Sequence, residues 1–399
     1  MVIPPTVRVV AGNLEVENDY VNNLCAYLAN FDHVTFACPV APDGAQGILK
    51  SQPISCLRDA DRLTYIRLPH TYREDKHLCH YFSTRKILLS EISKAKYLLF
   101  SPHANYDWPT LGAKLAMKLK RKYCIESDYD HPSVSNLQLR VMRFGAKKLR
   151  KSLWARSFNK QVNLCMARSS IALLQGQEVY DAYKNIAPNP SKVLNVQVSS
   201  DDQIPLAELK AKLNKITNGE PLSIAYAGRM IEMKGPLDWL KAISATIEKG
   251  VDLQAAWFGD GPMMAEMQSN VERLELSRNV SLYGILSREQ LTARLRRTDI
   301  FLFCHKTGES PRCLSEALAT GCLLVGYTGA FPRDLVARHG GGIFVDRGDW
   351  EMLASTLVSL DRDRARLAQL VEAAAASGKE LDRDTAIQNR IELIKKYLS

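Results

Sequence analysis

The chain has 399 residues, of which 46% are hydrophobic and 24% are charged, and its formal net charge is +10. This length suits two domains of ordinary size, and the composition excludes a disordered or fibrous protein. No apolar run approaches the ~20 residues that cross a bilayer. The nine cysteines include no Cys-x-x-Cys pair, which favours reduced core residues over disulfides or a zinc site. We therefore predict a cytoplasmic protein.

The positive charge is concentrated between Arg140 and Lys160, where eight residues are Lys or Arg and none is Asp or Glu. Leu149, Leu153 and Trp154 lie among them. This mixture suits an anionic membrane surface, and it predicts peripheral attachment to the inner face of the cell membrane. A solvated helix face explains the same residues equally well. Nucleic acid is less favoured as a partner, because no nucleic-acid-binding motif accompanies the charge.

Short β-branched and aromatic runs alternate along the chain with segments of helical length. In the first half we predict strands at Val7–Ala11, His33–Cys38, Leu63–Leu68, Tyr97–Ser101, Tyr123–Ser127, Ser169–Leu174 and Val193–Gln197. In the second half we predict strands at Ser223–Ala227, Leu253–Phe258, Val280–Tyr283, Ile300–Cys304, Leu323–Tyr327 and Ile343–Val345. Such alternation indicates an α/β fold with parallel, doubly wound sheets.

Turn-forming residues divide the chain into two Rossmann-like domains. Residues 199–220 begin with Ser199-Ser200-Asp201-Asp202 and end on the turn signal Asn218-Gly219-Glu220-Pro221. We predict an N-terminal domain over 1–198, a linker over 199–220 with a short helix, a C-terminal domain over 221–378 and a final helix over 379–399. That helix carries one apolar face, formed by Ile387, Ile391, Ile394 and Leu398. We expect this face to dock on the N-terminal domain.

The first informative motif is Gly228-Arg229-Met230, followed by Lys234-Gly235-Pro236. A strand ends near Gly228, and Pro236 suits the first position of a helix. Loops at the carboxyl edge of a parallel sheet are where such folds bind ligands. Arg229, Lys234 and the free N–H groups of the helix would together suit a diphosphate. Two ordinary surface cations beside a tight turn are the alternative.

Two weaker motifs follow later strands. Gly259-Asp260-Gly261-Pro262 is best explained as a structural turn. After the strand at Val280–Tyr283, the backbone of Gly284 and Ile285 is placed to hydrogen-bond the edge of a nucleotide base.

The strongest motif runs from Thr307 to Gly321. Ser310 suits the N-cap of a helix and Pro311 its first position, so Ser310, Pro311 and Arg312 would present the helix start to a donor. Glu309 would then lie just before the helix and Glu316 inside it, and both carboxylates can accept hydrogen bonds from sugar hydroxyls. The alternative for Glu316 is an ion pair with Arg312, four residues earlier.

At these motifs the sequence resembles glycosyltransferase family 4, which includes bacterial polysaccharide glycosyltransferases. The likeness is good from Ser223 to Leu360 and holds only in outline before that. It implies the GT-B fold, with the sheets of two Rossmann-like domains facing across a cleft. It implies that the N-terminal domain (1–198) is acceptor-binding and that the C-terminal domain (221–378) is nucleotide-sugar-binding. It also implies that Arg229 and Lys234 bind the donor diphosphate, that Glu316 holds the ribose and that Glu309 lies near the transferred sugar. The family's two glutamates are separated by seven residues, whereas six separate Glu309 from Glu316, and Gly308 occupies the expected position.

The resemblance is looser in the first half. The family's glycine-rich loop after the first strand is reduced here to Gly12, whose backbone can still approach phosphates. The family often has a histidine near the reacting sugar, and the candidates for that place are Asp128, His131 and His103.

The resemblance implies an enzyme that moves a hexose-type sugar, with retention, from a UDP- or GDP-linked donor to a glycan or lipid-linked acceptor. The donor is a substrate, and we expect no cofactor and no metal, because Arg229 and Lys234 would take over the metal's electrostatic role. Two alternatives stay open. One is a sugar-nucleotide epimerase of the same fold. The other is a non-catalytic nucleotide-sugar-binding scaffold, which the altered glutamate spacing and the missing glycine would suit.

Overall fold

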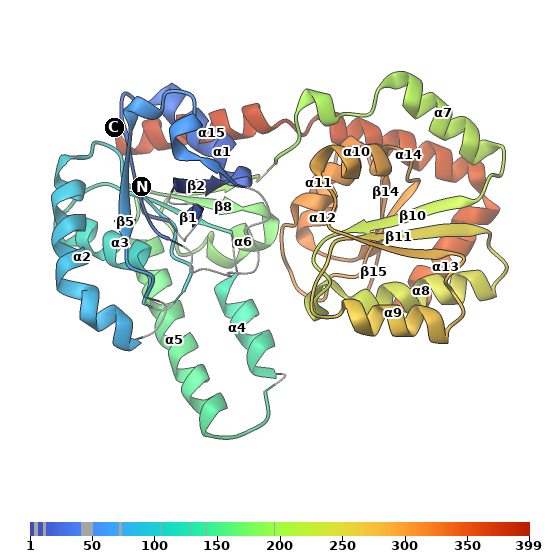
Figure 1. The fold of residues 1–399 in the computed structure, drawn as a ribbon, viewed down its shortest axis with the longest axis horizontal. Helices are drawn as coiled ribbons and strands as arrows, with labels where there is room; N and C mark the ends of the chain where they lie inside the picture. Colours follow the sequence, from blue (N-terminus) through green and yellow to red (C-terminus); the bar gives the residue numbers. More distant parts are fainter. Residues whose placement is uncertain are drawn as a thin grey trace. The chain divides into compact units, whose positions relative to one another are not determined.

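The computed structural model describes residues 1–3, 7–10, 13–40, 51–71, 74–104, 106–128, 130–140, 142–194 and 196–399. The chain divides into two compact units (Figure 1). The first unit comprises Met1–Leu194 together with Asp384–Ser399, and the second comprises Asn195–Arg383. None of the helices in these ranges is long and apolar enough to cross a bilayer.

Parallel strands form the centre of the first unit. They are β3 (Val34–Pro39) beside β5 (Leu63–Leu68), and the row β6 (Leu99–Phe100), β7 (Cys124–Ser127), β8 (Ile171–Gln175) and β9 (Pro190–Val193). Val2 makes parallel bridges to Ala37 in β3 and to Phe100 in β6, so it joins the two groups. The predicted strands of this region overlap those observed, although β9 ends at Val193, where the predicted strand begins.

The prediction of Val7–Ala11 as the first strand of the parallel sheet was wrong. Residues Val7–Val10 form β1, which pairs antiparallel with β2 (Asn13–Glu17), and β2 pairs antiparallel with β4 (Ser51–Pro53). The register places Val7 opposite Val16, and both side chains are fully buried. Antiparallel pairing therefore gives the β-branched run a buried partner. The position between β3 and β6 in the parallel sheet is instead occupied by Val2. Gly12 lies outside the described residues.

Helices cover both faces of the parallel strands in the first unit. One core contains side chains of α2 (Glu74–Lys94), α3 (Trp108–Lys118), α5 (Ala146–Ala167) and α6 (Gly176–Tyr183). The other core contains side chains of α1 (Asn18–Asn30) and α15 (Arg383–Leu398). Ile387, Ile391, Ile394 and Leu398 of α15 are all buried in this second core. Arg390 adds an ion pair, because its Nη1 donates to Glu126 Oε1 over 2.9 Å.

The second unit is built on a six-stranded parallel sheet with the order β12-β11-β10-β13-β14-β15. Its strands are β10 (Leu222–Ala227), β11 (Leu253–Phe258), β12 (Val280–Gly284), β13 (Ile300–Phe303), β14 (Leu323–Tyr327) and β15 (Gly342–Val345). All six predicted strands are confirmed to within one residue at each end. The surrounding helices are α8 (Pro236–Glu248), α9 (Met264–Arg273), α10 (Arg288–Arg296), α11 (Arg312–Ala319), α12 (Ala330–Leu335), α13 (Trp350–Arg362) and α14 (Arg364–Lys379).

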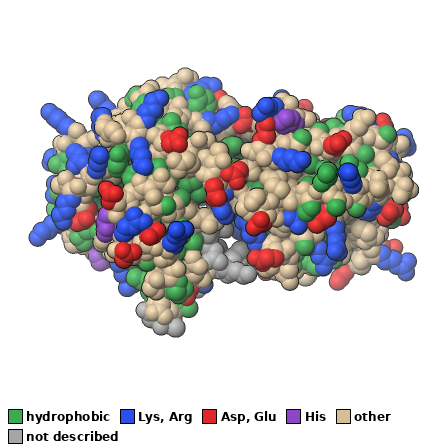
Figure 2. Space-filling model, turned by 90° about the horizontal axis from the view of Figure 1, so that it is seen from above, with side chains coloured by type: hydrophobic (Ala, Val, Ile, Leu, Met, Phe, Trp, Pro, Cys, Tyr) green, Lys and Arg blue, Asp and Glu red, His purple; other side chains and the backbone are tan. Residues whose placement is uncertain are grey.

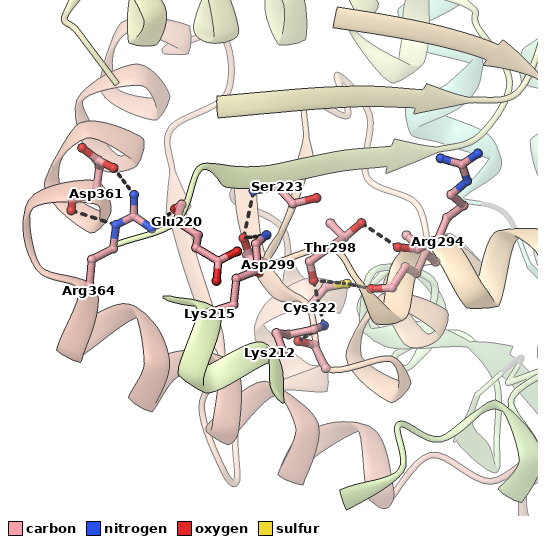
Figure 3. A network of polar contacts seen from close by, with 12 residues as sticks. Lys212, Lys215, Glu220, Ser223, Arg294, Thr298, Asp299, Cys322, Asp361 and Arg364 are labelled. Atoms are coloured by element: carbon pink, nitrogen blue, oxygen red, sulfur yellow. Dashed lines mark hydrogen bonds and ion pairs between the residues drawn. The ribbon is translucent and has the colours of Figure 1, made fainter. Parts of the chain in front are cut away.

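The residues suggested as a linker, 199–220, belong to the second unit. Their helix α7 (Leu206–Thr217) is fixed by Lys212, whose buried Nζ donates to the carbonyls of Thr298, Thr320 and Gly321 over 2.7, 2.9 and 2.9 Å (Figure 3). Burial lowers the pKa of Lys212. One turn later, Lys215 pairs with Asp299, which also accepts from the Ser223 amide. These contacts tie α7 to the amino edge of the sheet.

Candidate functional site

The sheet of the second unit reverses its strand order between β10 and β13. The chain adds β11 and β12 on one side of β10, and then crosses to add β13, β14 and β15 on the other. The loops after β10 and β13 therefore leave the carboxyl edge of the sheet in opposite directions, which is where open α/β sheets bind ligands. We call these loops the β10 loop (228–235) and the β13 loop (304–311).

One ion pair joins the two loops. Lys234 Nζ donates to Glu309 Oε2 over 2.7 Å, and the side chains of Lys234 and Glu309 are only 11% and 21% exposed. Lys234 ends a 3-10 turn (Glu232–Lys234), and Gly235 then adopts a left-handed φ of 65° before α8 begins at Pro236. A Cβ on Gly235 would lie 2.2 Å from the Cys304 carbonyl oxygen. Glycine is therefore required at this position for both its conformation and its close contact with the β13 loop.

Two buried side chains, Tyr226 and His305, lie next to the Lys234–Glu309 pair. The Tyr226 hydroxyl and His305 Nε2 share a hydrogen bond of 2.7 Å, and both residues are buried. Burial, followed by the charges of Lys234 and Arg347, lowers the pKa of His305 well below its usual value. Burial raises the pKa of Tyr226 well above its usual value. Both side chains are therefore neutral at pH 7, and the imidazole Nδ1 lies 3.8 Å from Glu309 Oε1.

The β13 loop also carries two buried oxygen atoms that lack a hydrogen-bond partner among the described residues. They are Thr307 Oγ1 and Glu309 Oε1. A buried polar atom without a partner costs roughly 1–3 kcal/mol, and such atoms are uncommon in folded proteins. Two of them on one loop, beside a lysine, indicate a place where polar groups of a ligand complete the hydrogen bonding.

The remaining residues predicted for the donor site lie around these loops. Arg229 is exposed on the β10 loop. Helix α11 begins at Arg312, with Pro311 as its N-cap in an extended conformation (φ −74°, ψ 130°). The prediction of Ser310 as the cap and Pro311 as the first helical residue was therefore wrong by one residue. Glu316 is half-buried in α11. Burial raises the pKa of the Cys313 thiol to about 12, an effect that Lys234 opposes and that Glu316 and Glu309 reinforce. Both glutamates and Lys234 thus influence the pKa of the same half-buried thiol.

The glycines after β11 have a structural role. A Cβ on Gly259 would lie 2.1 Å from the Gly228 carbonyl oxygen, and one on Gly261 would lie 2.4 Å from that of Met230. The Met230 amide donates to the Asp260 carbonyl over 2.9 Å. The turn therefore packs directly against the β10 loop and holds it in place. Gly284 is part of the same arrangement, since its carbonyl accepts from the Gly259 amide, whereas the neighbouring Ile285 is 55% exposed.

The three polar candidates of the first unit lie near one another, beyond the carboxyl ends of β6 and β7. Burial and then the charge of His103 lower the pKa of His131 to about 4. Asp128 is exposed as a residue. Desolvation of its carboxyl group nevertheless raises the pKa above the usual value, and the proximity of His103 opposes that rise. His131 also packs edge-on against Phe158, with ring centroids 5.1 Å apart. It is thus the most enclosed of the three.

A cavity of about 600 Å³ lies at the opposite edge of the first unit's strands. Its lining includes Val34, Thr64 and Leu99, which are at or next to the amino ends of β3, β5 and β6. None of the predicted site residues lines it. Within the described ranges, no group of three His, Cys, Asp or Glu side chains is arranged to hold a metal ion.

Sequence reasoning missed Tyr226, His305 and Thr307 as parts of this site. His305 follows a buried strand at the switch in strand order, which was an available signal. No sequence signal pointed to Tyr226, because it has the appearance of an ordinary strand residue and its hydrogen-bond partner, His305, is 79 positions away.

Residues 209–377 match the model of the family Glycosyl transferases group 1. The second unit carries a Glycosyl transferases group 1 domain. The matched range includes most of α7, the β10 and β13 loops and α11, and thus every contact described above between those loops.

Part of the chain is similar to an exopolysaccharide phosphotransferase from Streptomyces coelicolor, with 29% identity over 144 residues. The match covers 36% of this chain and spans only 15% of that protein.

Two solved structures are similar along nearly the whole chain. HepE from Anabaena in complex with UDP has a TM-score of 0.68 and 16% identity, with 99% of each chain covered. HepE has also been solved with UDP-glucose. Sucrose-phosphate synthase from Thermosynechococcus elongatus has a TM-score of 0.68 and 14% identity, with 99% of this chain and 98% of that one covered. These similarities show the GT-B fold.

Proposed function

We propose that the protein transfers a hexose-type sugar, with retention, from a UDP- or GDP-linked donor to a glycan or lipid-linked acceptor. The observation that carries the proposal is the Lys234–Glu309 pair at the switch in strand order of a Glycosyl transferases group 1 domain. HepE supports it as a protein of the same fold that was solved with UDP and with UDP-glucose.

The chemistry follows from the charges on the β10 loop. Cleavage of the bond between sugar and diphosphate leaves negative charge on the leaving phosphate. Lys234 is held in a partly buried site, where an electrostatic contact is stronger than in water. It has three N–H donors and uses one of them on Glu309. The others are available to a diphosphate, and Arg229 on the same loop adds a second positive charge.

Glu309 supplies the complementary part of the donor site. Its Oε1 lacks a hydrogen-bond partner among the described residues, and a sugar hydroxyl is a suitable donor to it. Thr307 Oγ1 offers a second polar group on the same loop. The sequence resemblance implies that Glu316 binds the ribose, and we include it in the proposal on that ground. His103, Asp128 and His131 are the first unit's contribution to the acceptor side.

The test is to incubate the full chain with UDP-glucose, GDP-mannose and related donors, with and without glycan acceptors, and to identify the products by NMR. We expect a new glycosidic bond with the anomeric configuration of the donor and release of the nucleoside diphosphate. An altered sugar nucleotide formed without acceptor would instead identify an epimerase. Tight donor binding with no product under any condition would favour the scaffold.

A further inference from the structure

Helices α4 (His131–Arg140) and α5 (Ala146–Ala167) form a hairpin that extends from the first unit (Figure 1). The connection between them is held by Lys148, whose Nζ donates to the Met142 carbonyl over 3.1 Å. At the tip, the side chain of Phe144 is completely exposed. A single exposed apolar side chain is common, whereas several on one element indicate an interaction site.

The two halves of α5 differ in burial. Phe158, Val162, Cys165 and Met166 in the second half are buried in the core of the first unit. No residue between 146 and 157 is buried. The second half therefore anchors the helix, and the first half presents its side chains outward.

Apolar side chains recur on the outward face of α5. Leu149, Leu153 and Leu164 are 65%, 55% and 46% exposed, and spacings of four and eleven residues place them on one side of a helix. Trp154 directly follows Leu153 and therefore lies about 100° around the helix from it, beside the outward face. It is 40% exposed, and the Arg150 guanidinium lies over its ring, 5.0 Å from the centroid. Leucine and tryptophan are the residues that amphipathic helices insert at the boundary between headgroups and acyl chains.

The charge of the hairpin is of one sign. No Asp or Glu occurs between Asp130 and Glu178, whereas that stretch contains nine Lys or Arg. The face of the molecule shown in Figure 2 is different, because acidic side chains are interspersed among the basic ones there. The hairpin thus combines basic residues, with no acidic residue in its own sequence, with exposed leucine, phenylalanine and tryptophan.

We infer that the α4–α5 hairpin docks on an anionic lipid surface, with Phe144, Leu149, Leu153 and Trp154 entering the headgroup boundary. Charge complementarity selects anionic lipids, because each Lys or Arg near such a surface strengthens binding about fivefold. The exposed apolar side chains favour lipid over nucleic acid as the partner. A nucleic-acid phosphate backbone can bind the Lys and Arg side chains, but it has no apolar surface that would bury the leucines. Long basic side chains can reach the headgroups while their stems stay in apolar surroundings.

Vesicle sedimentation tests the inference with the full chain, and its readout does not depend on sugar transfer. The vesicles contain phosphatidylcholine alone or with about 30 mol% phosphatidylglycerol. We expect binding only to the anionic vesicles and release as salt screens the charges. Equal binding to both vesicles, or binding that 0.5 M salt leaves unchanged, would overturn the inference.

Matched variants locate the surface. Leu149 and Leu206 are 65% and 63% exposed, but only Leu149 is on the hairpin. We expect Leu149→Ser with Leu153→Ser to weaken vesicle binding about tenfold or more, and Leu206→Ser to leave it unchanged. Lys147→Gln with Lys151→Gln should weaken binding similarly, whereas Lys210→Gln with Lys249→Gln, at exposed positions outside the hairpin, should not. Equal effects of the hairpin variants and their controls would refute the assignment.

Tryptophan fluorescence provides a second readout. Of the five tryptophans, Trp108, Trp239 and Trp257 are fully buried, Trp350 is half-buried, and Trp154 is exposed. Anionic vesicles should shift the emission to shorter wavelength, and Trp154→Phe should remove the shift. If the emission shift survives in Trp154→Phe, the hairpin is not the inserted element. Binding of single-stranded RNA that the Lys variants abolish, in the absence of vesicle binding, would assign the surface to nucleic acid.

Discussion

Lys234 and Glu309 are 75 positions apart in the chain, and their side chains meet over 2.7 Å where the β10 and β13 loops diverge. A second pair, Lys306 with Glu232, joins the same loops on the solvent side, and its side chains are 33% and 67% exposed. The two pairs have the same chemistry and differ in burial. Because of this difference, a role of Lys234 in binding the donor can be distinguished from a role in merely holding the two loops together.

Lys234→Ala should lower kcat/KM for transfer by about 10²–10³, because one preorganised donor to a developing negative charge contributes roughly 3–4 kcal/mol. Lys306→Ala should change it less than about threefold, because exposed ion pairs contribute at most ~1 kcal/mol. Steady-state kinetics on both variants, with circular dichroism to verify folding, make the comparison. Equal losses in the two variants would show that the loops need only to be held together, and that Lys234 has no contact with the diphosphate.

Glu309→Gln separates nucleotide binding from sugar binding. The amide keeps the shape of the side chain but removes the negative charge that offsets Lys234. We expect UDP to bind a few times more tightly, because Lys234 is no longer neutralised, while transfer falls by at least tenfold. Calorimetric titration measures the affinity for UDP, and a transfer assay measures the rate of sugar transfer. Weaker UDP binding by this variant would mean that Glu309 contacts the nucleotide itself.

Gly235→Ala should destabilise the protein more than Gly250→Ala. Both glycines have left-handed φ values, 65° and 85°, but a Cβ meets the Cys304 carbonyl oxygen at 2.2 Å only in the case of Gly235. The substitution at Gly250 costs about 1 kcal/mol of backbone strain. At Gly235 the clash adds to this strain, and we expect a total above ~3 kcal/mol. Urea unfolding of both variants measures the difference, and equal midpoints would contradict the close packing of the two loops.

His131 should make the stability depend on pH between about 4 and 6.5. Its pKa in the folded protein is about 4, whereas an unfolded histidine titrates near 6.5. In this range the unfolded chain binds the additional proton, so the free energy of unfolding falls as the pH falls, by about 3 kcal/mol in total. His131→Gln removes this contribution and retains the other titrating groups. The check is the slope of unfolding free energy against pH in both proteins, and parallel slopes would disprove the shifted pKa.

The strands of the second unit could be predicted closely because each is a continuous apolar run bounded by turns. Leu253–Phe258 and Leu323–Tyr327 have the predicted bounds. The same signal failed at Val7–Ala11, because a β-branched run looks alike in parallel and antiparallel sheets. The segment that lies between β3 and β6 includes Val2. It is too short to show the alternation of apolar and polar residues that identifies a strand. Local pattern therefore identifies strands better than it identifies their partners.

In the candidate site too, individual residues could be predicted from local sequence, but the contacts between them could not. Lys234 and Glu309 were predictable one by one, since each follows a strand end, but their contact depends on strand order. Lys212 was not predictable as a buried residue. It shares a helix face with Leu209 and Ile216, and only the three carbonyls that surround it explain a lysine there. Three-dimensional hydrogen-bond partners of this kind leave no trace in local composition.

The contribution of α15 to the first unit has a consequence for synthesis. Residues up to Leu194 leave the ribosome long before Ile387, Ile391, Ile394 and Leu398, which complete one of the two cores of that unit. At about 5–20 residues per second, the delay is on the order of 10–40 s. Throughout this interval the nascent first unit has an open apolar face. The second unit is contiguous in sequence, and its last residue, Arg383, is added just before the apolar residues of α15. The N-terminal half of this protein is therefore expected to finish folding last and to be the half that needs chaperones.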